Sequence, residues 1–236
     1  MMKRFLSLLL ILALAAGLIT VSVPALAADN SPDTSAVAYF EVKFHCGCTW
    51  NGTGTMIATN AMITAAHNLV CYTHNRGVNT ATFYFERDNR KYRTSYNGKF
   101  NYHSYADFSR GYESDDDIAY IIFPKDIGSN TGWYASSAES DDDIKWEFCH
   151  MIGYNGYKRL YDWEQVEVES SKLISWPASR EYREGNQGGP VYYRYEGLEY
   201  PVLVAVYITC SNTRAYARRI TNNIYSDMER DGAKFN

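Results

Sequence analysis

Two residues far apart in the sequence carry side chains that acyl-transfer chemistry uses. His67 ends the apolar segment MITAAH, and Asp117 begins the apolar segment DIAYI. An imidazole takes the proton from a nucleophile, and a carboxylate holds the imidazole in its productive tautomer. We therefore predict that His67 and Asp117 form one site, with the adjacent Asp115 and Asp116 facing solvent. The other histidines lack such surroundings, and we predict no catalytic role for them: His45, His74, His103 and His150.

Cysteines are the second reactive group, and the chain has 5 of them: Cys46, Cys48, Cys71, Cys149 and Cys210. One alternative is a zinc site made by the first three cysteines and His67. Zinc sites usually show a C-x2-4-C spacing and a clear second pair of ligands, and the segment CGC at 46–48 does not fit that pattern. We therefore expect no metal and no cofactor. In an oxidising compartment we expect disulfides, and an odd number leaves at least one thiol outside an intramolecular bridge.

An acidic motif, ESDDDI, occurs at 113–118 and again at 139–144. Calcium prefers oxygen ligands, so a calcium site is the functional interpretation. Neither copy has the alternating acidic spacing and the glycine turn of an EF-hand loop. Runs of adjacent aspartates are more typical of solvated turns, and this is our prediction for both copies.

The N-terminal segment has the features of a secretory signal peptide. Lys3 and Arg4 precede an apolar run at 6–23, and the residues ALA at 25–27 offer a small-residue cleavage site. The alternative is a membrane anchor, because the apolar run is close to the shortest length that spans a bilayer. We predict cleavage after residues 1–27 and a secreted, extracellular protein with no membrane attachment afterwards.

The composition of the rest of the chain favours β-strands. The whole chain has 236 residues, including 21 tyrosines, and its net charge of -4 gives no basic surface for nucleic acid or anionic membranes. Short apolar or alternating segments predict strands, at 36–44, 54–58, 61–64, 81–86, 118–123, 147–154, 163–174, 189–195 and 202–209. Residues 124–133 contain Pro and Gly and predict a connector. A helix is predicted at 221–230, with Thr221 as its cap.

These elements favour an all-β protein with two packed β-barrels, at 36–124 and 130–236, and a C-terminal helix in the second part. A glycine-rich segment, GNQGGPV at 185–191, lies in the second half. In their order, the segments GTGTMI, MITAAH, DIAYI and GNQGGPV resemble the chymotrypsin-like (trypsin-like) serine proteases, most closely the secreted bacterial branch of glutamyl-endopeptidase type. The resemblance extends from residue 36 to about residue 228.

The resemblance implies two six-stranded antiparallel barrels with a cleft between them. His67 and Asp117 would come from the first barrel, and residue 187 from the second. It also implies a monomer whose substrate or ligand is a peptide or protein. A disulfide from Cys71 to Cys46 or Cys48 would echo a loop-closing bridge of the family, and Cys149 with Cys210 would form a second bridge.

The chain departs from the family at the nucleophile. The family has serine in Gly-Asn-Ser-Gly or Gly-Asp-Ser-Gly, and this sequence has Gln187. A carboxamide nitrogen is delocalised into its carbonyl group and is not a usable nucleophile. The surrounding backbone matches, so the resemblance still assigns the oxyanion hole to Gly185 and the N–H of Gln187.

The sequence gives weaker indications of substrate preference than of the catalytic motifs. Glu181 occupies the place of the acid at the base of the trypsin-type pocket, where it would attract a basic side chain. The alternative is a surface-loop acid. Glutamyl-specific members use a histidine on the strand that corresponds to 205–209, and this chain has none there. Asn186 stands where zymogen-activated members have aspartate, so activation by N-terminal cleavage is not expected.

Three hypotheses follow. The favoured one is a secreted, proteolytically inactive homologue that binds a peptide or protein. The second is an active serine endopeptidase, which requires an error at Gln187 or another nucleophile. The third is a calcium- or carbohydrate-binding β-protein unrelated to proteases, and the order of the motifs disfavours it.

Overall fold

The computed structural model describes residues 34–87, 90–98, 101–112, 114–145, 147–155, 158–178, 186–194 and 201–235. The predicted signal peptide, Glu181 and Gly185 lie outside these ranges. Within them, no helix combines the length and the apolar character that crossing a bilayer requires.

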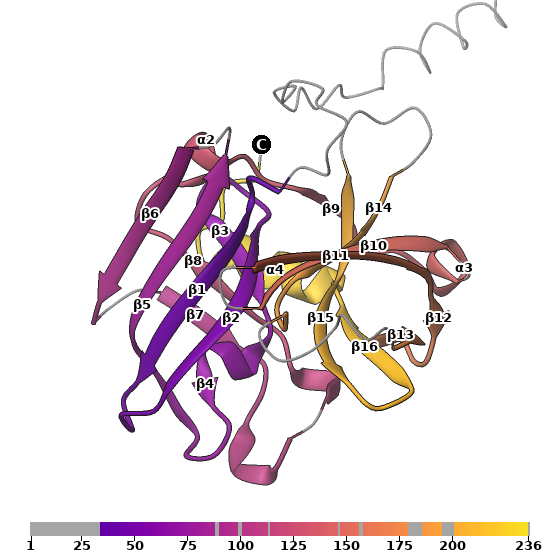
Figure 1. Ribbon diagram of the computed structural model, residues 1–236, viewed down its shortest axis with the longest axis horizontal. Helices are drawn as coiled ribbons and strands as arrows, with labels where there is room; N and C mark the ends of the chain where they lie inside the picture. The colour runs from indigo at the N-terminus through magenta and orange to yellow at the C-terminus, as the bar shows by residue number, and fades with distance from the viewer. Residues whose placement is uncertain are drawn as a thin grey trace, which may run out of the picture.

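The described strands form two antiparallel sheets, which lie side by side in Figure 1. The first has 8 strands in the order β4-β5-β1-β2-β3-β8-β7, with β6 paired to β5. Its strands are β1 (Val37–Phe44), β2 (Thr49–Met56), β3 (Ala61–Thr64), β4 (Val70–Cys71), β5 (Arg76–Arg87), β6 (Arg90–Asn97), β7 (Asn101–Ser104) and β8 (Ala119–Ile122).

The second sheet also has 8 strands, in the order β11-β10-β14-β15-β16-β13-β12, with β9 parallel to β15. Its strands are β9 (Ala135–Ser136), β10 (Phe148–Asn155), β11 (Lys158–Gln165), β12 (Glu167–Val168), β13 (Leu173–Pro177), β14 (Pro190–Tyr193), β15 (Val202–Cys210) and β16 (Arg214–Arg219). Short helices lie between strands: η1 (Ala66–Asn68), η2 (Phe108–Arg110), η3 (Ser114–Asp116), α2 (Gly128–Thr131) and α3 (Asp141–Ile144). The chain ends with α4 (Asn222–Arg230).

The all-β prediction of two barrels and a C-terminal helix is confirmed, with a barrel and a half-barrel built from sheets of eight strands each in place of six. Two of the central strands, β3 and β8, are largely apolar. Every residue of β3 and of β8 is buried, because each has a neighbour on both edges and core on its faces. A large apolar cluster begins in the first sheet and reaches β10, β14 and β15 of the second through Ile152, Tyr192 and Leu203. The two sheets therefore share packed side chains.

Helix α4 packs the end of the chain into the large apolar cluster and lies near the middle of the view in Figure 1. Ile224 and Met228 are buried in the large cluster. The Tyr105 hydroxyl donates to Asp227 at 2.6 Å. Thr221 occupies the N-cap position of α4 as predicted, but its side chain makes no hydrogen bond to the helix.

Several predicted boundaries differ from the structure. The predicted strand at 163–174 is divided among β11, β12 and β13, and the connector at 124–133 contains α2. Strands β6, β7 and β16 were not predicted. Their sequences, RKYRTSYN, NYHS and RAYARR, are too polar to stand out as strands.

Candidate active site

His67 and Asp117 meet just beyond the ends of two paired strands. β3 and β8 pair with Thr64 opposite Ala119. η1, which contains His67, follows β3, and Asp117 precedes β8, so both residues lie at the same end of the strand pair. The Nδ1 atom of His67 lies 2.7 Å from Oδ2 of Asp117. The backbone N–H of His67 donates to Oδ1 at 3.0 Å. Asp117 is completely buried and His67 is 8% exposed, so the structure brings the two predicted partners together.

Tyr112 supplies a further hydrogen bond to Asp117. Its hydroxyl donates to Oδ2 at 2.9 Å. Burial of the hydroxyl and the charge of Asp117 raise the pKa of Tyr112, so it stays a neutral donor. The ring of Phe108 stacks on that of Tyr112 with centroids 6.2 Å apart. Sequence analysis missed Tyr112, because no motif distinguishes it among the 21 tyrosines.

The turn at 186–189 brings the second sheet to the His67 segment. The backbone carbonyl of Gln187 accepts from the N–H of Thr53 at 2.9 Å and from Nδ2 of Asn68 at 2.8 Å. The N–H of Gly188 donates to the carbonyl of Tyr207 at 2.7 Å. The main chain of Gln187 is therefore held beside the residue that follows His67.

Gly188 is required by both conformation and space. Its φ of +92° favours glycine, and a Cβ atom there would lie 1.9 Å from the carbonyl oxygen of Thr53 and 2.2 Å from Oγ1 of Thr64. The turn is thus defined by backbone hydrogen bonds and close packing against β2 and β3. None of these contacts uses the side chain of residue 187.

Asn68 connects the two sides of the site. It is completely buried, and its Nδ2 also donates to Oγ1 of Thr64 at 3.0 Å. Its Oδ1 accepts from Nε1 of Trp50 at 3.1 Å, and the Trp50 ring lies edge-on to His67 with centroids 6.4 Å apart. Sequence analysis passed over Asn68, although its position directly after His67 could have drawn attention to it.

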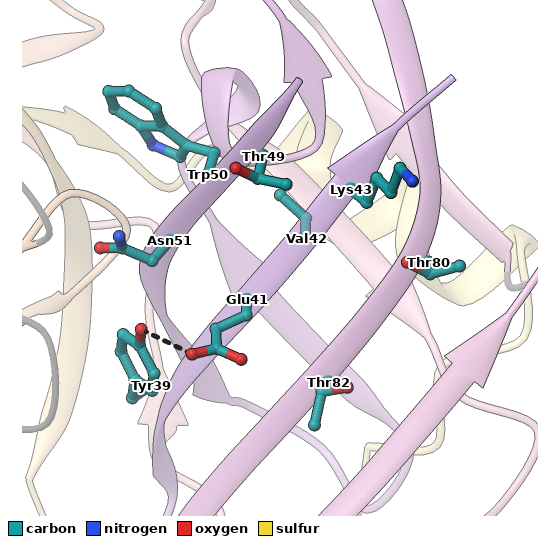
Figure 2. Close-up of a pocket in the computed structure, with 9 residues that line it drawn as sticks. All are labelled: Tyr39, Glu41, Val42, Lys43, Thr49, Trp50, Asn51, Thr80 and Thr82. Atoms are coloured by element: carbon teal, nitrogen blue, oxygen red, sulfur yellow. Dashed lines mark hydrogen bonds between the residues drawn. The ribbon is translucent and has the colours of Figure 1, made fainter. Parts of the chain in front are cut away.

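Trp50 also borders a groove of about 430 Å³ on the outer face of β1, β2 and β5 (Figure 2). Within this groove Glu41 accepts from the hydroxyl of Tyr39 at 3.1 Å. Lys43 and several hydroxyl groups make the rest of the lining polar. The groove is lined by Tyr39, Glu41, Val42, Lys43, Thr49, Trp50, Asn51, Thr80 and Thr82.

The acidic motifs have contacts that differ from the prediction. Asp115 and Asp116 are half-buried and do not simply face solvent. Asp116 forms an ion pair with Lys172 at 3.0 Å. In the second copy, Asp141, Asp142 and Asp143 are exposed as predicted, although Asp141 also pairs with Arg219, which is buried. Each motif therefore connects a loop to the second sheet.

No disulfide joins any of the five cysteines in the structure, so neither the implied bridge of Cys71 nor the implied Cys149–Cys210 bridge is present. Cys71 instead lies with Cys46, Cys48 and His74. The alternative set with His67 is not assembled, because His67 binds Asp117.

No family model matches the sequence, and no curated protein matches it. The structure, however, is similar to solved protease structures. A Glu endopeptidase in complex with MPD has a TM-score of 0.67 at 15% identity, over 88% of this chain and 94% of that one. Protease Anisep from Arthrobacter nicotinovorans has 0.66 at 12%, over 84% and 95%. HL collagenase has 0.62 at 16%, over 86% and 95%. This protein therefore has the double-barrel fold of the chymotrypsin-like serine proteases.

Proposed function

We propose that this protein is a secreted, proteolytically inactive homologue of the trypsin-like serine proteases that binds a peptide or protein segment. One observation carries the proposal. The pair of His67 and Asp117 is fully assembled, while the turn that approaches it from the second sheet has Gln187 where the family has its nucleophile.

The chemistry of Gln187 supports inactivity. Covalent acyl transfer requires a group that becomes nucleophilic when His67 takes its proton. The lone pair of an amide nitrogen is delocalised into the carbonyl group and is not available for attack. Imidazole is also too weak a base to remove a proton from that nitrogen. Loss of the nucleophile in such enzymes removes nearly all of the rate and leaves binding intact. His67 and Asp117 would then serve to shape the cleft.

Peptide binding is supported by the fold and by the groove beside Trp50. The similar structures include enzymes named as an endopeptidase and a collagenase. The groove offers a hydroxyl, a carboxylate and an ammonium group from Tyr39, Glu41 and Lys43 that suit the polar backbone of an extended peptide. The leader at 1–27 supports secretion, and the resemblance supports a monomer.

The direct test measures cleavage and binding on one preparation. Purified protein is incubated with fluorescein-labelled casein, and hydrolysis and fluorescence anisotropy are followed. We expect no cleavage, no reaction with a fluorophosphonate probe, and saturable binding that weakens in Trp50→Ala. Active trypsin is the positive control for cleavage.

Two results would contradict the proposal separately. Hydrolysis that disappears in His67→Ala would show an active enzyme with another nucleophile. Absence of casein binding, with a correctly folded protein by circular dichroism, would reject the binding role while leaving the inactivity intact.

A further inference from the structure

A cluster of sulfur and nitrogen ligands lies apart from the catalytic pair, where two turns of the first sheet meet. Cys46 and Cys48 are in the turn between β1 and β2. Cys71 ends β4, and His74 lies in the turn between β4 and β5. Cys71 is buried and Cys48 is half-buried, whereas His74 is exposed.

The spacing of the ligand atoms fits a small tetrahedral ion. One ligand atom from each of the four residues lies within 4.8 Å of all the others. The Nδ1 atom of His74 is 3.6 Å from Sγ of Cys48 and 3.5 Å from Sγ of Cys71. Tetrahedral zinc, with bonds of about 2.3 Å to sulfur and about 2.0 Å to nitrogen, places such a pair about 3.6 Å apart.

Backbone hydrogen bonds hold the two turns in place before any ion binds. The N–H of Gly47, whose φ is +89°, donates to the carbonyl of Phe44 at 2.9 Å, which closes the turn between the first two cysteines. The N–H of His74 donates to the carbonyl of Cys71 at 3.3 Å. The N–H of His45 donates to Gly77 at 3.0 Å and joins the two turns. The ligands are therefore positioned by the fold.

We propose that Cys46, Cys48, Cys71 and His74 bind one structural zinc ion. Three thiolates and an imidazole are the soft donors that zinc prefers in closed structural sites. The protein supplies all four ligands, which leaves no position for a catalytic water. This site replaces the expectation of no metal, and its second ligand pair is the Cys71-x2-His74 segment that the sequence analysis did not combine with CGC.

The alternative is a disulfide between Cys71 and one of the other two cysteines. A disulfide uses two sulfurs and gives no role to the third cysteine or to His74. Zinc uses all four groups, and in the oxidising compartment that the proposed secretion implies it would protect these thiols from oxidation. The full convergence of the four ligand atoms favours zinc.

The site has a structural consequence for the catalytic pair. Cys71 is four residues after His67, and Tyr72 packs edge-on to Trp50 with centroids 6.3 Å apart. Trp50 in turn contacts His67 and hydrogen-bonds Asn68. Bound zinc would therefore stabilise the segment that positions His67, whether or not the protein is catalytic.

Metal analysis of the purified protein tests the proposal. We expect about one zinc per chain by plasma mass spectrometry, with cobalt substitution giving the absorption bands of tetrahedral thiolate coordination. Cys46→Ser, Cys71→Ser and His74→Asn should each lower zinc retention on dialysis by at least about tenfold, because a ligand is lost. Matched controls of the same residue types should retain zinc: Cys149→Ser, Cys210→Ser, His45→Asn and His67→Ala.

The wild-type protein also provides a test that does not depend on variant folding. A strong chelator should lower its melting temperature by at least about 5 °C, and added zinc should restore it. Substoichiometric zinc together with a mapped disulfide at Cys71 would overturn the proposal. Zinc that survives His74→Asn but is lost in His67→Ala, or iron or copper in place of zinc, would also overturn it.

Discussion

The two sides of the candidate active site are held together in different ways. On the first sheet, the side chain of Asp117 accepts from the backbone N–H and the ring of His67 and from the hydroxyl of Tyr112. On the second sheet, the turn around Gln187 is held through its backbone and through Gly188. The first side therefore depends on the identity of its side chains, and the second depends on its main chain.

This difference determines what a substitution costs on each side of the site. A buried carboxylate is tolerated only while it is hydrogen-bonded, so a change at His67 or Tyr112 leaves part of Asp117 unsatisfied. A change at residue 187 leaves the two hydrogen bonds to its backbone carbonyl in place. Those hydrogen bonds therefore do not require serine at this position.

We expect the largest loss of stability at Gly188, where the turn of the second sheet depends on its backbone conformation. Gly188→Ala should lower the free energy of unfolding by about 3–5 kcal/mol, because the new Cβ combines a strained φ with a clash against β2 and β3. Gly98→Ala is the matched control, since Gly98 has a φ of +89° and open space around it. It should cost only about 1 kcal/mol.

Urea unfolding of the two variants decides between these effects. Equal losses in Gly188→Ala and Gly98→Ala would show that packing against β2 and β3 does not fix the turn. That result would contradict the conclusion that the Gln187 turn is held by its main chain, in contrast to the side of the site that contains Asp117.

The smaller effect is expected on the first side of the site. Tyr112→Phe removes one of the donors to Asp117 and should cost about 1–2 kcal/mol by urea unfolding. Tyr72→Phe is the control, because Tyr72 is about as exposed as Tyr112 and packs on Trp50 through its ring edge, whereas the hydroxyl that donates to Asp117 is that of Tyr112. Identical stabilities of the two variants would remove Tyr112 from the group that supports Asp117.

The predictable part of the fold came from apolar strands. Strands β1, β3, β8 and β15 were found because most of their residues are buried and apolar. β6 was not predicted because its inward face is formed by tyrosines. One of them is Tyr96, whose ring centroid lies 5.5 Å from that of Phe123. β16 was not predicted because it carries buried arginines. Their charges are satisfied by contacts that only the tertiary structure reveals.

The site was predictable where the chemistry resides in a motif. The structure pairs His67 with Asp117 and brings the turn of Gln187 to Asn68. Their catalytic roles remain predictions. Tyr112 was not predictable, because it reaches Asp117 through a loop without a recognisable pattern. His74 was assigned no role, because its partnership with three cysteines depends on two turns that meet only in the folded chain.

Labelling of Gln187→Ser with a fluorophosphonate probe tests the central claim most directly. The claim is that the nucleophile is missing while the rest of the site is formed. We expect no labelling of the wild-type protein or of Gln187→Ala. Gln187→Ser should be labelled, and adding His67→Ala to that variant should abolish the reaction, because the new hydroxyl needs the imidazole as its base. Labelling of the wild-type protein, or a folded Gln187→Ser variant that stays unreactive, would contradict the claim.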